Sequence, residues 1–246
     1  MQVPSIYRGC SGFYNKGWVG IFYPEGMPGK EWFGYYTKHF STFEINATFY
    51  KFPTLRVMQN WYNRAPDGFI FAVKAPKTIT HIKRFADCAE EIKAFYDVCR
   101  DGLAEKLGPC LFQLPPSFSF SEERLEMVVS SLDPAFKNVV EFRHASWWRE
   151  DVYTALAKKG ITFCSVSYPK LDDTIIENSG TGYVRLHGTP KLFYSEYSLK
   201  EIEDLYAAIA AKGFKELFVF FNNTASTAGI INANQLKDMA NISARN

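Results

Sequence analysis

The chain has 246 residues, of which 47% are hydrophobic and 22% are charged, with a formal net charge of +2. This length fits one α/β barrel, and the composition is that of a globular protein and excludes disordered and fibrous classes. The small net charge argues against non-specific nucleic-acid binding through a basic coat. No apolar run reaches the roughly 20 residues of a membrane span, and residues 1–6 lack a secretion signal. We therefore expect a cytoplasmic protein with no membrane partner.

Short β-branched and aromatic runs alternate with amphipathic stretches along the chain. This alternation indicates βαβ units and a parallel sheet. We find no internal repeat and no linker, so the sequence predicts a single (β/α)8 barrel of the TIM type, with residues 1–246 as one domain. The eight predicted strands are residues 6–10, 42–45, 70–73, 110–113, 139–142, 162–166, 183–186 and 216–221.

Helices are predicted between the strands, beginning with Trp32–His39 and Leu55–Arg64. Asp87 is expected to open a later helix, and Ser121 another, because such side chains accept hydrogen bonds from the first turn. Ser198 and Glu201 have the spacing of a capping box. Residues 13–30 form a long aromatic loop, and loops of this length in compact domains are usually functional.

The cysteines are five in number and include no C-x-x-C pair. An odd count without metal-ligand spacing favours buried, reduced thiols in a cytosolic protein.

Polar residues follow every predicted strand, and the carboxyl ends of parallel strands are where barrels place their chemistry. Strand side chains alternate between faces, so pairs spaced i, i+2 point to one side. A dry helix-facing layer would leave charged groups without partners, so we expect these side chains at the barrel mouth. The residues are Ser11, Glu44, Asn46, Lys74, Gln113, Glu141, Arg143, Ser165, Ser167, Arg185, His187, Asn222 and Asn223.

Structural roles are the alternatives for several of these residues. Glu141, Arg143 and Arg185 would also suit an interior ion-pair layer, because alternate strands supply the same layer of a barrel. Asn222 and Asn223 would suit a turn.

Three further candidates lie in predicted loops. His81 follows the third strand and is a candidate for proton transfer. Trp18 and Trp147 are candidates for ligand contacts, with core packing as the alternative.

The chain carries short motifs at residues 9–13, 22–24, 43–46, 48–50, 71–74, 112–116, 140–144, 184–188 and 221–223. Together these motifs resemble the DUF72 (YecE-like) family, and the likeness runs almost end to end. The family resemblance implies a TIM-type barrel and implies no established reaction. One departure is Ser165-Val166-Ser167-Tyr168-Pro169, where relatives often carry an acidic residue before the proline, and this weakens a mechanism that needs a third carboxylate.

The first functional hypothesis is an enzyme acting on a small anionic or phosphate-bearing ligand, with nucleic acid as an alternative partner and a hydrolase, phosphodiesterase or isomerase-like reaction. The guanidinium group of arginine binds two phosphate oxygens at once, while histidine and carboxylate side chains act as general acids and bases. We expect no metal and no cofactor, because neighbouring guanidinium groups repel divalent cations. The predicted catalytic residues are Glu44, Glu141, His187 and His81, and the predicted binding residues are Ser11, Trp18, Asn46, Lys74, Gln113, Arg143, Trp147, Arg185, Asn222 and Asn223.

Two alternatives stay open. Glu44 and Glu141 would serve as the two carboxylates of a glycosidase, in which an inverting mechanism suits their wide expected separation. The same pocket would also serve a protein that binds a small ligand without chemistry.

Overall fold

The structure is a computed structural model that describes residues 5–243. One eight-stranded sheet has the strand order β1-β8-β7-β6-β5-β4-β3-β2, and each pair whose register is defined is parallel. This order, with crossovers between successive strands, is that of a (β/α)8 barrel, so the predicted fold class is confirmed. The strands are β1 (Ser5–Cys10), β2 (Thr42–Ile45), β3 (Ile70–Lys74), β4 (Leu107–Gln113), β5 (Asn138–Glu141), β6 (Thr162–Ser167), β7 (Thr181–Leu186) and β8 (Glu216–Phe221).

The helices follow their local sequence signals in most cases. Ser121 Oγ accepts a hydrogen bond from Arg124 N (3.2 Å) as the cap of α5, and Ser198 and Glu201 form the predicted capping box of α7. The helices are α1 (Trp32–His39), α2 (Ala47–Tyr50), α3 (Leu55–Arg64), α4 (Ala89–Leu103), α5 (Glu122–Ser131), α6 (Glu150–Ala157), α7 (Leu199–Ala210) and α8 (Ala228–Ser243).

The prediction for Asp87 is wrong. Helix α4 begins at Ala89 with Cys88 as its cap residue, and Asp87 has a positive φ of 45°. Asp87 therefore belongs to the turn that precedes the cap, a left-handed conformation that aspartate tolerates better than most residues.

The crossover from β6 to β7 departs from the regular pattern. Residues 168–180, all within the described chain, contain turns, bends and irregular backbone but no helix. The other six crossovers each contain an α-helix. The expected alternation of strand and helix is therefore broken once.

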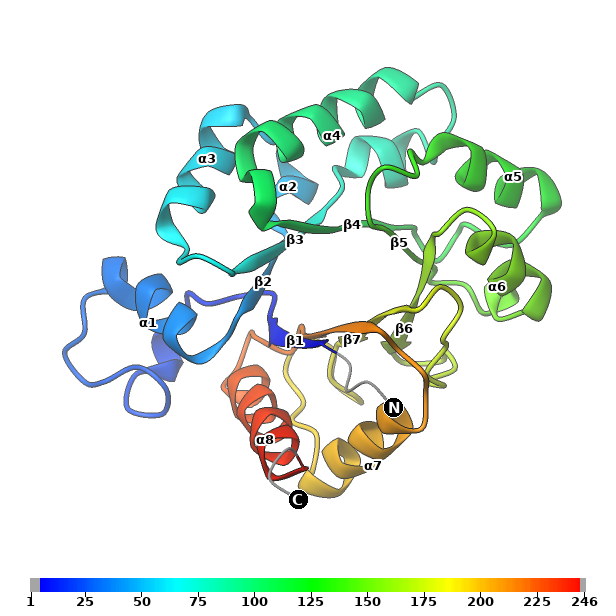
Figure 1. Ribbon diagram of the computed structural model, residues 1–246. Coiled ribbons are helices and arrows are strands. Elements are labelled where there is room, and N and C mark those ends of the chain that lie inside the picture. The colour runs from blue at the N-terminus through cyan, green and yellow to red at the C-terminus, as the bar shows by residue number, and fades with distance from the viewer. Residues whose placement is uncertain (1–4, 244–246) are drawn as a thin grey trace. The chain divides into compact units, whose positions relative to one another are not determined.

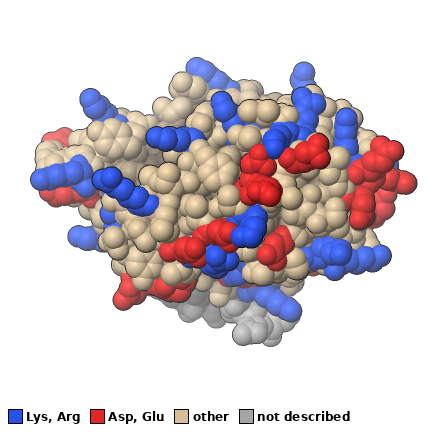
Figure 2. Space-filling model, turned by 90° about the horizontal axis from the view of Figure 1, so that it is seen from above, with Lys and Arg blue, Asp and Glu red and all other residues tan. Residues whose placement is uncertain are grey.

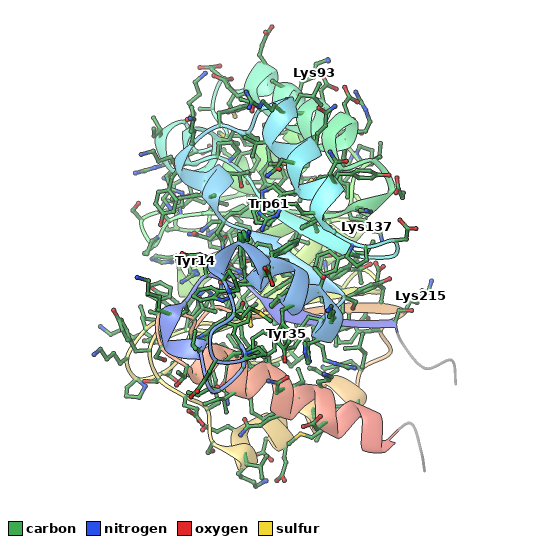
Figure 3. The ribbon with its side chains drawn as sticks, turned by 90° about the vertical axis from the view of Figure 1, so that its left-hand side faces the viewer. Tyr14, Tyr35, Trp61, Lys93, Lys137 and Lys215 are labelled. Carbon is green, nitrogen blue, oxygen red and sulfur yellow. The ribbon has the colours of Figure 1, made fainter. Side chains whose placement is uncertain are left out.

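The chain divides into two compact units, Met1–Phe43 with Ser165–Asn246, and Glu44–Cys164. That residues 1–246 act as one domain stays a prediction. In the first unit, α7 and α8 lie side by side, and α8 packs on β1 and β8 (Figure 1). The aromatic loop is also anchored there, because Tyr23 stacks on Trp32 (4.8 Å between centroids) and the ring of Tyr14 lies 4.8 Å from the same indole (Figure 3).

In the second unit, α3 and α4 lie beside each other over β3 and β4 (Figure 1). Gly102 on α4 permits this approach, since a Cβ built there would lie 2.2 Å from Met58 Cβ of α3. Trp61 of α3, labelled in Figure 3, packs its ring 5.8 Å from that of Phe71 in β3.

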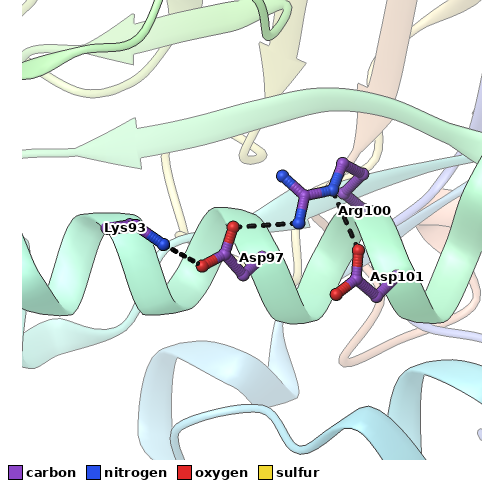
Figure 4. A network of polar contacts seen from close by, with 4 residues as sticks. All are labelled: Lys93, Asp97, Arg100 and Asp101. Carbon is purple, nitrogen blue, oxygen red and sulfur yellow. Dashed lines mark hydrogen bonds and ion pairs between the residues drawn. The ribbon is translucent and has the colours of Figure 1, made fainter.

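The surface carries intermixed charges. Helix α4 has a chain of ion pairs in which Asp97 accepts from Lys93 (2.6 Å) and from Arg100 (3.0 Å), and Arg100 also contacts Asp101 (2.9 Å; Figure 4). On the face drawn in Figure 2, acidic and basic side chains are likewise interspersed. Within the described residues, no helix has the length and apolar character needed to cross a bilayer.

All five cysteines are buried and none forms a disulfide, as far as the described chain extends. This placement matches the expectation of buried thiols, because the small apolar sulfhydryl packs well in a core.

Candidate functional site

The ends of β3, β4 and β5 bring several predicted residues of the second unit together. Lys74 Nζ donates to Gln113 Oε1 (2.8 Å) and lies over the ring of Phe49 at 4.2 Å. An ammonium over an aromatic face is attracted by the negative ring face. Thr48 Oγ1 also donates to the backbone oxygen of Lys74 (2.6 Å), which fixes the end of this strand. Lys74 is therefore a positioned cation that is only partly exposed.

Arg143 and Glu141 form an ion pair at the end of β5. Arg143 Nε donates to Glu141 Oε1, with 8% of the arginine side chain and none of the glutamate side chain exposed. The i, i+2 spacing placed both side chains on one face, as strand geometry requires. A buried guanidinium held in this way keeps its plane fixed, so the pair resembles the structural alternative more closely than an open phosphate fork.

His81 lies beside these groups, in a π-helical turn formed by Thr78–Ile82. Its Nδ1 is 3.0 Å from Thr80 Oγ1, and its ring packs edge-on against Phe49 at 4.9 Å. Burial, the largest cause, and the nearby cations Lys74 and Arg143 together lower the pKa of His81 to about 4. Glu141 raises it, but by less than these effects combined. His81 is therefore neutral at pH 7 and sits in a positive local field.

Glu44 and Asn46 meet at the end of β2. Glu44 is fully buried, and its Oε1 accepts from Asn46 Nδ2 (2.9 Å). Asn46 Oδ1 has no hydrogen-bond partner within the part of the chain that the structure describes. An amide oxygen in this state is an acceptor that a ligand or a water would satisfy.

In the first unit, Arg185 and His187 end β7 with 2% and 1% of their surface exposed. The ring of His187 packs edge-on against Tyr168 (5.6 Å) and Phe193 (6.1 Å). Such burial places both side chains inside the fold rather than in solvent.

Asn223 braces the loop that follows β7. Its Nδ2 donates to Ser195 O (2.9 Å) and to Asn232 Oδ1 (3.1 Å). Asn232 Nδ2 in turn donates to the backbone oxygen of Tyr197 (2.8 Å). Tyr197 Oη in turn donates to Ser167 Oγ (2.8 Å). Through this network, Asn223 helps to fix the loop that follows β7. Asn222 is 6% exposed.

The remaining candidates are placed as follows. Trp18 and Trp147 are fully buried, and each indole nitrogen donates to a backbone oxygen, of Ser226 (2.9 Å) and Phe118 (2.7 Å) respectively. These contacts are those of core tryptophans. Ser11 donates its backbone nitrogen to Phe221 O (3.1 Å) beside the end of β1.

Sequence reasoning missed two contributors. Phe49 supplies the ring against both Lys74 and His81, and Tyr197 links β6 to the loop after β7. The Thr48-Phe49-Tyr50 run directly after β2 was a usable signal for Phe49, since strand ends carry the site. The role of Tyr197 depends on tertiary contacts.

The structure thus assembles Lys74, His81, Gln113, Glu141 and Arg143 within the second unit. Arg185, His187, Asn222 and Asn223 belong to the first unit. That all of them line one pocket stays a prediction. Among the described residues, no group of three or more His, Cys, Asp or Glu side chains is arranged to hold a metal ion.

Comparisons with known proteins agree with this architecture. A DUF72 protein of Thermotoga maritima has a solved structure that is 32% identical, with a TM-score of 0.86 over 96% of this chain and 99% of that one. A DUF72 protein of Enterococcus faecalis is 18% identical with a TM-score of 0.82 over 96% and 95% of the two chains, which shows the fold.

Curated relatives are also similar in sequence. The protein YunF of Bacillus subtilis is 22% identical over 96% of this chain and 95% of its own length. YecE of Escherichia coli O157:H7 is 29% identical over 68% of this chain, and that match spans 59% of YecE. The family model described as "Protein of unknown function DUF72" matches residues 7–246. The chain therefore belongs to the DUF72 family.

Proposed function

We propose that the group around Lys74 and His81 binds a small anion, such as the phosphate of a phosphate-bearing ligand, and that His81 exchanges a proton with that ligand. The observation that carries the proposal is the positive field at His81. Besides burial, which is the largest cause, Lys74, Arg143 and Arg84 each lower the pKa of this histidine, and Glu141 offsets only part of the effect of these cations. A site whose cations outweigh its carboxylate favours an anionic occupant.

Lys74 is the central binding group in this proposal. Its ammonium carries three donors, and its contacts with Gln113 and Phe49 hold it in place. Arg143 contributes charge from a fixed position, because Glu141 already engages its Nε. The binding residues are thus preorganised, which reduces the entropy lost when a ligand binds.

His81 supplies the chemistry. The neutral imidazole accepts or donates one hydrogen bond at each nitrogen. An anion bound nearby offsets the field of Lys74 and Arg143, so the pKa of His81 rises when the site is occupied. Anion binding is then coupled to proton uptake, and the affinity for anions increases as the pH falls. A histidine tuned in this way acts as a general acid or base only while the ligand is bound.

The glycosidase alternative receives less support. Glu141 is held by Arg143, and a carboxylate in a charge-assisted pair is a poor proton donor. A protein that only binds a small ligand would use the same cations. It would differ from an enzyme only in that His81 transfers no proton to the ligand.

Titration with inorganic phosphate, followed by calorimetry and by NMR of the histidine ring signals, tests the proposal. Lys74→Met is expected to weaken phosphate binding about 10-fold or more, the scale of a lost charge-assisted hydrogen bond. Lys93→Met is the matched control, because it removes a lysine of the same unit from the exposed face of α4 (Figure 4). Equal phosphate affinity in Lys74→Met and the parent protein would refute the proposal.

A further inference from the structure

The hydroxyl of Thr80 contacts the imidazole of His81, its neighbour in the π-helical turn after β3. Thr80 is fully buried, and its Oγ1 lies 3.0 Å from His81 Nδ1. This is the one hydrogen bond that the His81 ring makes to the described residues. The other ring nitrogen, Nε2, is not sealed from solvent, because the side chain is only half-buried. Nε2 is therefore the nitrogen that is open to a ligand.

The direction of the hydroxyl proton follows from its two nearby acceptors. Pro76 O lies 3.5 Å from Thr80 Oγ1, beyond the range of about 2.5–3.0 Å that is usual for an O–H···O bond. That carbonyl also accepts from the backbone nitrogens of Ile79 (3.1 Å) and Thr80 (3.4 Å). His81 Nδ1, at 3.0 Å, is the better acceptor. The hydroxyl therefore donates to Nδ1, and a nitrogen that accepts a hydrogen bond carries no proton.

The tautomer of the neutral histidine is fixed by this contact. A neutral imidazole has one proton, so an unprotonated Nδ1 leaves that proton on Nε2. The open nitrogen of His81 is then a hydrogen-bond donor, and the lone pair of the ring points at the Thr80 hydroxyl. A donor in this place suits an oxygen that carries no proton, such as an oxygen of a phosphate, a carboxylate or an ester. A hydroxyl that has to lose its proton would find no base there.

The backbone of the turn keeps the threonine and the histidine in one arrangement. Within and after Thr78–Ile82, Lys83 N donates to Thr78 O (2.9 Å). Phe85 N donates to Ile79 O (3.0 Å), which closes the turn a second time. Phe85 is buried and has a φ of 68°, a left-handed conformation that is unfavourable for a bulky residue. Such strained residues and π-helical turns both occur preferentially at binding and active sites.

We propose that Thr80 is a positioning residue that holds the neutral His81 as the tautomer protonated at Nε2, so that this nitrogen donates to an unprotonated oxygen of the ligand. His81 is then a donor or general acid toward the ligand, and not a base. The class of ligand narrows to compounds that present an anionic or ester oxygen at this point. The inference rests on the proposed anion site for its occupant, whereas the tautomer itself exists without any ligand.

The tautomer is measured by long-range proton–nitrogen NMR of protein with isotope-labelled histidine, without phosphate and at about pH 7.5, where His81 is neutral. The signal that His81→Gln lacks identifies the residue. We expect a proton on Nε2 and a bare Nδ1 in the parent protein. Thr80→Val removes the hydroxyl at nearly the same shape and should give averaged signals from a mixture of tautomers. Thr80→Ser should restore the parent pattern, and Thr37→Val, which removes a hydroxyl bonded to Gly34 O in α1, should leave it unchanged.

Phosphate titration tests the side of the ring that faces the ligand. The amide nitrogen of glutamine reaches about as far as Nε2, whereas that of asparagine reaches only as far as Nδ1. His81→Asn is therefore expected to bind inorganic phosphate about 10-fold more weakly than His81→Gln, the scale of a hydrogen bond to a charged group.

Three results would overturn the inference: a proton on Nδ1 in the parent protein, a Thr80→Val pattern identical to that of the parent, or equal phosphate affinities of the two His81 variants. A parent protein that binds no phosphate would instead refute the proposed anion site. The NMR spectra, recorded without phosphate, would still decide whether Thr80 fixes the tautomer.

Discussion

Replacing His81 with glutamine is expected to change how the stability of the protein depends on pH. The pKa of His81 is lowered from 6.5 to about 4 in the folded state. Between these pH values, the unfolded chain binds more protons than the folded chain. The free energy of unfolding therefore increases as the pH rises from about 4 to 6.5, and this stabilisation is lost when the solution is acidified. The difference between a pKa of 6.5 and one of about 4 corresponds to about 3.4 kcal/mol, at 1.36 kcal/mol for each pH unit. His81 is only half-buried, so solvent screening reduces the expected contribution to about 1–2 kcal/mol.

Urea denaturation of the parent protein and of His81→Gln, at about pH 7.5 and about pH 4.5, measures this contribution. The difference in unfolding free energy between the two pH values should be smaller in the variant by about 1–2 kcal/mol. In Lys74→Met, NMR titration should show the pKa of His81 moving up toward 6.5, because one of the cations that lower it is gone. Lys93→Met should leave this pKa unchanged. An identical pH dependence in the parent and His81→Gln would refute the reasoning.

Substitutions at packed positions give further expected outcomes. Gly102→Ala should destabilise the protein by about 1–2 kcal/mol in denaturation, because the clash with Met58 outweighs the gain in helix propensity. Gly34→Ala, on an open face of α1, should instead stabilise it by about 0.5–1 kcal/mol. Lys106→Met should cost about 1–3 kcal/mol, since its buried ammonium donates to the carbonyls of Tyr62 and Ala65 at the end of α3. Arg185→Ala should weaken phosphate binding by about 1–3 kcal/mol. A loss of stability with unchanged phosphate affinity would contradict this and assign Arg185 to an interior ion-pair layer.

The sequence predicted the strands well because their signal is local. The bounds of β2 and β8 agree with the predicted runs, and those of the other strands differ by up to three residues at an end. The capping box of α7 was predictable for the same reason, since both partners lie within one turn. Asp87 was mispredicted because the conformation of the preceding turn overrides the capping preference. The helix missing after β6 depends on what else covers the sheet, which local patterns do not encode.

For the candidate site, the alternation of side chains along a strand predicted that Glu141 and Arg143 lie on the same face. It could not show that the two side chains form an ion pair. It also could not reveal that Lys74 lies on Phe49, because that contact joins residues from two different strand ends. The burial of Trp18 and Trp147 was weighed as an alternative only, since aromatic loop residues serve cores and ligands alike.

The buried cysteines provide built-in reporters of local opening. Burial raises the pKa of Cys10 and Cys99, and it raises the pKa of Cys110 to about 12. Alkylating reagents attack the thiolate, so at neutral pH each of these thiols reacts only when its surroundings open. Cys10 lies in the first unit, and Cys99 and Cys110 lie in the second. Residue-resolved alkylation rates would therefore show whether the two units open together or separately, without any added label.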